Sequence, residues 1–87
     1  MDLQKEFSDL VDTLKMERDI IALQLHLATM DVKEEFETLD EKWEIVAQKA
    51  AEVADDAVDV SEDALEKAKI VGEELKEAYH RVRSRLS

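Results

Sequence analysis

Apolar residues recur in steps of three and four from Leu3 to Leu86, and this spacing is the strongest signal in the sequence. Such steps place side chains on one face of an α-helix, at close to the coiled-coil period. The sequence therefore predicts an all-α protein built on one long apolar stripe. The predicted core positions of this stripe are Leu25, Val32, Phe36, Leu39, Trp43, Val46, Val71, Leu75 and Val82. Charge interrupts it at Glu17 and Arg18, which predicts a register-setting contact or a hydrated layer.

A second apolar stripe is confined to the first part of the chain, with steps of four, three, four and three residues. Its members are Met16, Ile20, Leu23, Leu27 and Met30. At about 100° per residue they lie roughly opposite Ile21 and Leu25. A helix that is apolar on two faces is normally covered on both sides. We therefore predict that the second stripe is the contact of a homodimer or higher homo-oligomer. The alternative is a three-helix core with an exposed, methionine-rich edge.

An acidic window from Glu52 to Glu66 predicts where the chain turns, because it holds seven carboxylates and no basic residue. Like charges four residues apart each destabilise a helix by roughly 0.2–0.5 kcal/mol. We place the turn at about residues 56–60. Asp59 with Glu62 reads as a capping box for the following helix, and Ser61 is an alternative N-cap.

Thr29-Met30-Asp31 is a second candidate turn, where Asp31 and Glu34 form another possible capping box, but strong helix formers surround it. The favoured architecture is a single unit over residues 1–87, a long helical hairpin with helices at about 2–55 and 60–86. This antiparallel coiled coil would self-associate into a helical bundle. Two alternatives stay open: one uninterrupted helix in a dimer, or three helices of similar length.

Composition supports a small helical unit, because 87 residues include no proline and a single glycine, Gly72. The net charge of −11 repels phosphates and anionic lipid, so we expect no nucleic-acid partner. Cysteine is absent, which excludes disulfides and cysteine redox chemistry.

We expect no signal for secretion or membrane insertion. Its N-terminus lacks a basic region followed by an apolar run. The longest apolar stretch, Ile20 to Met30, is interrupted by Gln24 and His26 and is too short for a bilayer. We expect a cytoplasmic protein with no integral membrane segment.

Catalytic chemistry finds little support in the residue types present. No Ser-His arrangement or glycine-rich phosphate loop can be recognised, so we expect a protein that is not an enzyme and needs no cofactor. Five residues match a calcium loop: Asp55, Asp59, Ser61, Asp63 and Glu66. However, Ala57 and Val60 occupy its third position and its glycine position. Glu77 and His80 have di-iron spacing but fall on the polar side of their helix. We therefore expect no metal site.

A few further side chains carry specific expectations. Trp43 is predicted to be a core residue, and Tyr79 to flank the core with its hydroxyl in water. His26 is predicted to be an interface side chain, with a pH-sensitive contact as the alternative. The basic cluster between Tyr79 and Arg85 either complements its helix C-terminus or contacts the acidic surface of a neighbouring chain.

Two segments carry a family resemblance: Arg18-Asp19-Ile20 through Lys42-Trp43-Glu44, and Glu73-Glu74-Leu75 through Arg81-Val82-Arg83. Both resemble a family of small, uncharacterised bacterial coiled-coil proteins. The resemblance implies a bacterial, cytoplasmic and mostly helical protein. It assigns no activity or ligand to any residue.

Three functional hypotheses follow from the sequence. The first is a non-enzymatic structural or protein-interaction module that self-associates through the second stripe of its first helix. The second is an acidic decoy or inhibitor of the DNA-mimic type, which binds a basic partner protein through carboxylates such as those between Glu52 and Glu66. The third is an amphipathic coat of a lipid or polymer surface, although the polar face is acidic where such helices usually carry lysine.

Overall fold

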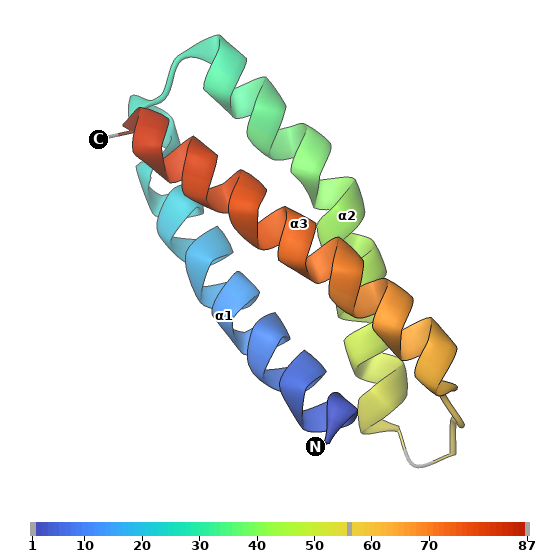
Figure 1. Ribbon diagram of the computed structural model, residues 1–87. Coiled ribbons are helices and arrows are strands. Elements are labelled where there is room, and N and C mark those ends of the chain that lie inside the picture. Colours follow the sequence, from blue (N-terminus) through green and yellow to red (C-terminus); the bar gives the residue numbers. More distant parts are fainter. Residues whose placement is uncertain (1, 56, 87) are drawn as a thin grey trace.

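The computed structural model describes residues 2–55 and 57–86, which fold into three α-helices and one short 3-10 helix. Helix α1 spans Leu3–Gln24, η1 spans Leu25–Leu27, α2 spans Met30–Ala54 and α3 spans Glu62–Leu86. The first and third helices run in the same direction, and α2 runs antiparallel to both (Figure 1). The all-α class predicted from the apolar spacing is confirmed.

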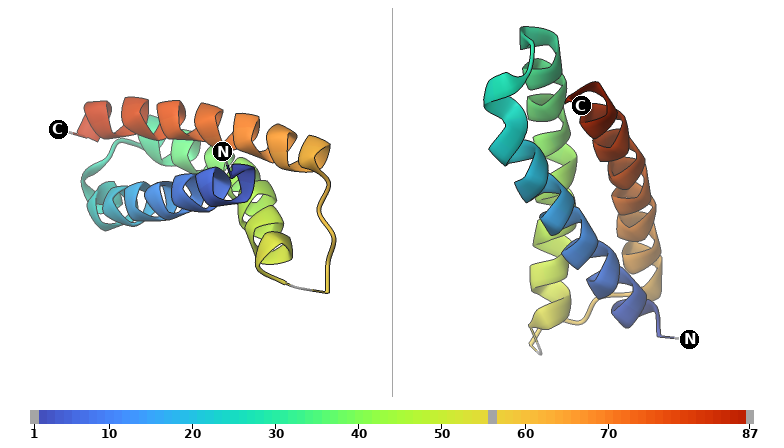
Figure 2. Two further views of the ribbon diagram at one scale, coloured as in Figure 1. Left: turned by 60° about the horizontal axis from the view of Figure 1, so that its bottom comes forward. Right: turned by 90° about the vertical axis from the view of Figure 1, so that its left-hand side faces the viewer.

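Helix α3 holds the bundle together. It packs along both α1 and α2, whereas α1 and α2 contact each other much less. Two further views show α3 lying across the other two helices, with α1 and α2 diverging away from the turn that joins them (Figure 2). Gly72 permits the close approach of α3 to α1, because a Cβ atom there would lie 2.8 Å from the Cδ2 atom of Leu10. The side chains that are fully or almost fully buried are Phe7, Leu14, Ile21, Val32, Phe36, Leu39, Val46, Leu65, Ala68, Leu75, Ala78, Tyr79 and Val82.

The predicted uninterrupted helix over residues 2–55 is wrong, because the chain reverses between α1 and α2. Residues 25–27 tighten into a 3-10 turn, and Ala28 and Thr29 then adopt extended backbone. Thr29 is the N-cap of α2: its side-chain oxygen accepts a hydrogen bond from the Val32 amide at 3.4 Å. The cap is therefore Thr29 and not the predicted pair of Asp31 and Glu34. The three helices contain 22, 25 and 25 residues, as in the three-helix alternative.

Tertiary packing explains this reversal. Local propensity favours a continuous helix, since the turn contains no glycine or proline. An isolated helix would leave its whole apolar stripe in water. Folding back buries Val32, Phe36 and Leu39, and each such side chain contributes about 1.5–3 kcal/mol. Helices in proteins draw most of their stability from such packing.

The second turn lies close to its predicted position. Helix α2 ends at Ala54 and α3 begins at Glu62; Asp56, in the predicted turn at residues 56–60, lies outside the described residues. Ser61 caps α3, because its hydroxyl oxygen accepts a hydrogen bond from the Ala64 amide at 3.2 Å. Of the two predicted caps, the structure therefore has Ser61 and not Asp59.

Arg18 joins α1 to α2 through two contacts. Its Nη2 atom lies 3.2 Å from Oδ1 of Asp40, and its guanidinium carbon lies 5.7 Å from the centre of the Trp43 ring. A cation over an indole face contributes about 0.5–1 kcal/mol at an exposed site. The charge that interrupts the stripe at Arg18 therefore makes a specific contact between α1 and α2, of the kind expected for a register-setting residue.

The prediction that the Tyr79 hydroxyl faces water is wrong. The side chain is fully buried, and its ring centre lies 6.0 Å from that of Phe36. Within the part of the chain that the structure describes, its hydroxyl oxygen has no hydrogen-bond partner. Burial raises the pKa of Tyr79 to about 12, while the nearby positive charge of Arg18 acts in the opposite direction.

Replacing Tyr79 by phenylalanine is expected to remove an alkaline loss of stability. The unfolded chain ionises this tyrosine near pH 10, whereas the folded pKa is about 12. As the pH rises, ionisation of Tyr79 therefore stabilises the unfolded state before it stabilises the folded state. Between pH 9 and pH 12 the free energy of unfolding of the wild type should fall by about 2 kcal/mol relative to that of Tyr79→Phe. Urea unfolding of both proteins across this pH range measures the difference. If the free energies of unfolding of the two proteins change with pH in parallel, a folded pKa above 10 is contradicted.

Candidate functional site

The most distinctive surface is the second apolar stripe, which we call the outer apolar face: Met16, Ile20, Leu23, Leu27 and Met30. In the single chain Leu23 is 75% exposed, Leu27 73%, Met30 70% and Met16 55%. Ile20 is half-buried. Monomeric proteins expose single apolar residues freely, but contiguous groups of large apolar side chains mark interaction sites.

Three elements contribute to this face. Met16, Ile20 and Leu23 lie on the side of α1 that is opposite its buried residues, Leu14 and Ile21. Leu27 ends η1 and Met30 begins α2, so the turn carries the face past the end of α1. The face therefore reaches the end of the bundle where α1 joins α2 and where α3 ends (Figure 1).

The predicted core residues lie where the bundle is packed. The buried ones are Val32, Phe36, Leu39, Val46, Leu75 and Val82. Leu25, Trp43 and Val71 are partly buried and pack against this core. His26, by contrast, is exposed in η1 beside the outer apolar face.

Ion pairs attach α3 to both neighbouring helices. Toward α1, Arg83 Nη1 lies 2.7 Å from Glu17 Oε2, and Lys69 lies 3.1 Å from Glu6. Toward α2, Arg85 pairs with Glu35. The basic cluster at the end of α3 thus contacts the acidic surface of its own chain. Glu17, which interrupts the main apolar stripe, is 6% exposed, so its carboxylate is buried beside Arg83.

Carboxylates gather at the opposite end of the bundle. Asp55, Asp59, Glu62 and Asp63 are all exposed, at or beside the connection between α2 and α3. Figure 1 places this connection far from the turn that carries the outer apolar face. The molecule therefore presents an apolar surface toward one end and an acidic surface at the other.

The candidate metal-binding residues have other contacts. Asp55 Oδ1 accepts a hydrogen bond from the Ala57 amide at 3.0 Å, and Ser61 caps α3. Glu77 and His80 are both exposed on α3. Among the described residues, no three histidine, aspartate or glutamate side chains are grouped so that they would hold a metal ion.

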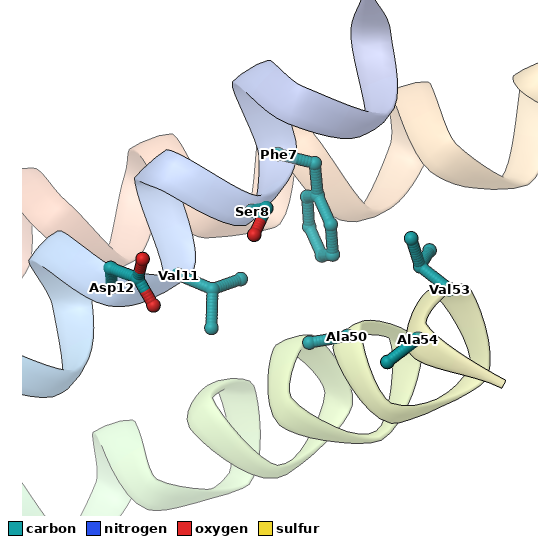
Figure 3. Close-up of a pocket in the computed structure, with 7 residues that line it drawn as sticks. All are labelled: Phe7, Ser8, Val11, Asp12, Ala50, Val53 and Ala54. Atoms are coloured by element: carbon teal, nitrogen blue, oxygen red, sulfur yellow. The ribbon is translucent and has the colours of Figure 1, made fainter.

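A shallow groove between α1 and α2 is a feature that the sequence did not predict. Its volume is about 200 Å³. Its lining is Phe7, Ser8, Val11, Asp12, Ala50, Val53 and Ala54 (Figure 3). It exists because α1 and α2 diverge where α3 bridges them. No sequence signal marks it, since it depends on the angle between two helices. Its apolar floor offers packing, while Ser8 and Asp12 are exposed polar groups beside it.

Comparisons with known proteins assign no family. No protein-family model matches the chain, and neither a curated protein nor a solved structure has significant similarity to it. None of the helices in the described ranges is long and apolar enough to cross a membrane.

Proposed function

We propose that the chain is a non-enzymatic interaction module that self-associates through the outer apolar face. The supporting observation is that four of its five large side chains are more than half exposed in the single chain. Met16, Ile20 and Leu23 follow one another at helical spacing on α1, so a second helix can pack along them, and Leu27 and Met30 extend the exposed apolar surface into the adjoining turn. A two-fold contact of this kind places the same face of both chains together.

The energetics favour a dimer of modest affinity. Covering each of these side chains contributes on the order of 1–2 kcal/mol, and a two-fold contact covers them on both chains. Association opposes this by roughly 4–15 kcal/mol of lost translational and rotational freedom. Two chains of net charge −11 also repel each other. Salt screens this repulsion, so self-association should strengthen as ionic strength rises.

A double substitution in the outer apolar face tests the proposal. Leu23→Glu with Leu27→Glu is expected to weaken self-association by at least about 100-fold, because it buries four carboxylates in the two-fold contact. The matched control is Ile45→Glu with Ile70→Glu, which adds the same charge at side chains that are 53% and 57% exposed elsewhere. Light scattering gives the masses, and far-UV circular dichroism verifies folding. Equal self-association by both double variants would contradict the proposal.

The acidic end supports a second candidate, a decoy or inhibitor that binds a basic partner protein. Its motivation is the exposure of Asp55, Asp59, Glu62 and Asp63 together. Binding of a lysine-rich peptide should weaken steeply with salt, the opposite of the dependence expected for self-association. It should also weaken when Asp59, Glu62 and Asp63 are replaced by their amides. Binding that is insensitive to both changes would exclude this candidate.

A further inference from the structure

Two residues carry most of the reversal between α1 and α2. Gln24 and Leu25 keep right-handed helical backbone, and residues 25–27 form a 3-10 turn. The chain then leaves the helical region at Ala28, with ψ 156°, and at Thr29, with ψ 165°. No described non-glycine residue has positive φ. Rotating these two ψ angles to about −40° and relaxing the short 3-10 turn would make the helix continuous from Leu3 to Ala54.

The residues of this turn favour such straightening. Leu25, Leu27 and Ala28 are good helix formers, and neither glycine nor proline marks the turn. The bend is therefore imposed by the packing of α1 and α2 on α3. If another chain supplied that packing, the local backbone preference would act to straighten the helix.

The contact faces of α1 and α2 would align on one straight helix. Glu17 and Glu35, which pair with Arg83 and Arg85 of α3, are 18 residues apart, which is about five helical turns. Arg18 and Asp40, which join α1 to α2, are 22 residues apart, or about six turns. On a straight helix, the contact residues of α1 and those of α2 therefore lie on the same side.

We propose that two copies of the chain exchange α1. The residues at 25–29 straighten, the two long helices run antiparallel, and each bundle receives α1 from the other chain. Every contact of α1, including those of the buried Phe7, Leu14 and Ile21, is then remade between chains. The contacts between chains then include those of a whole 22-residue helix with both of its neighbours. Exchange of identical elements is a low-cost route to dimers.

This exchange goes beyond the proposed function and does not depend on it. The α1 part of the outer apolar face, Met16, Ile20 and Leu23, lies on the side of α1 away from its buried residues, so it stays away from the core in the closed and in the exchanged form alike. The two modes of association therefore respond to different substitutions.

An intrachain distance reveals the exchange. Asp9 and Gln48 are exposed, and the chain has no cysteine, so Asp9→Cys with Gln48→Cys accepts two nitroxide labels. These positions are 39 residues apart, so a straight helix separates them by roughly 58 Å. The longest extent of the closed bundle is 42 Å. Labelled chains are refolded at high protein concentration with excess unlabelled chain, and pulsed electron resonance measures the distance. We expect a long distance in a fraction of chains that grows with concentration. A dimer with only short distances would overturn the exchange while leaving the proposed function standing. A monomer with only short distances would overturn both.

Two substitutions at Thr29 provide matched controls, because both remove the side-chain cap of α2. Proline fits the bent form, where Thr29 has φ −70° and follows the extended Ala28, but it opposes a continuous helix. Alanine favours the continuous helix. Thr29→Ala should strengthen exchange by roughly 100-fold, and Thr29→Pro should abolish the long distance. Equal fractions of the long distance in both variants would overturn the proposal. Persistence of the long distance in Met16→Glu with Leu23→Glu, which alters the outer apolar face outside the hinge, separates exchange from association through that face.

Discussion

Replacing Leu14 by alanine is expected to lower the free energy of unfolding by about 3 kcal/mol. Leu14 is fully buried in α1, and its Cδ1 atom lies 3.5 Å from where a Cβ of Gly72 would be. The cavity therefore opens beside Gly72, where α3 approaches α1 closely. Two packed helices cannot collapse freely into such a space, because their backbones are already fixed by contacts above and below.

Leu23 is the matched control for Leu14, because both are leucines of α1, Leu14 in its middle and Leu23 in its last turn. Leu23 is 75% exposed, so Leu23→Ala should change the free energy of unfolding by less than about 0.5 kcal/mol in dilute solution. Urea denaturation followed by far-UV circular dichroism measures both variants. Equal losses would mean that α1 does not pack with Leu14 facing the core and Leu23 facing solvent.

Replacing Arg83 by methionine is expected to destabilise the bundle by about 2 kcal/mol, because the carboxylate of Glu17 would stay buried without its partner. The Glu17 side chain is 8% exposed and its oxygen lies 2.7 Å from the guanidinium. Replacing both residues by methionine should restore most of the loss, since no charge is then left buried. Urea denaturation of the wild type, the two single variants and the double variant forms a double-mutant cycle. We expect a coupling energy of about 1.5 kcal/mol.

An exposed pair provides the comparison for this cycle. Lys67 and Asp63 lie four residues apart on α3, with side chains 76% and 79% exposed. Such pairs contribute about 0.3–0.5 kcal/mol. If the Glu17–Arg83 coupling is no larger than this, the charge at Glu17 is hydrated and does not position α3.

Apolar spacing was sufficient to predict the core of α2 and α3. Val32, Phe36 and Leu39 are buried because steps of three and four keep them on one side of the helix whatever the helix packs against. Leu65 and Tyr79 are buried outside that stripe. Their burial depends on α3 having a neighbour on each side, which a single stripe does not encode.

The reversal at Ala28 and Thr29 was only a secondary candidate, because its residues give opposite local and tertiary signals. The local propensity of these residues favours a continuous helix. In the bundle, the burial of Val32, Phe36 and Leu39 on α2 outweighs that propensity. The charges at Glu17 and Arg18 could be recognised as exceptions, but their partners Arg83 and Asp40 depend on how three helices are arranged. The outer apolar face follows from spacing alone, whereas its exposure required the structure.

Sedimentation equilibrium of the unmodified chain and of Leu23→Glu with Leu27→Glu, over a range of concentrations and at low and high salt, tests most directly whether the outer apolar face mediates self-association. A single chain has a mass of 10.0 kDa. The average mass of the unmodified chain should rise toward about twice this value with concentration, and rise further with added salt as the repulsion between acidic chains is screened, whereas that of the double variant should stay lower. A mass of one chain at every concentration and salt would contradict self-association, and a mass that falls with salt would contradict an apolar contact.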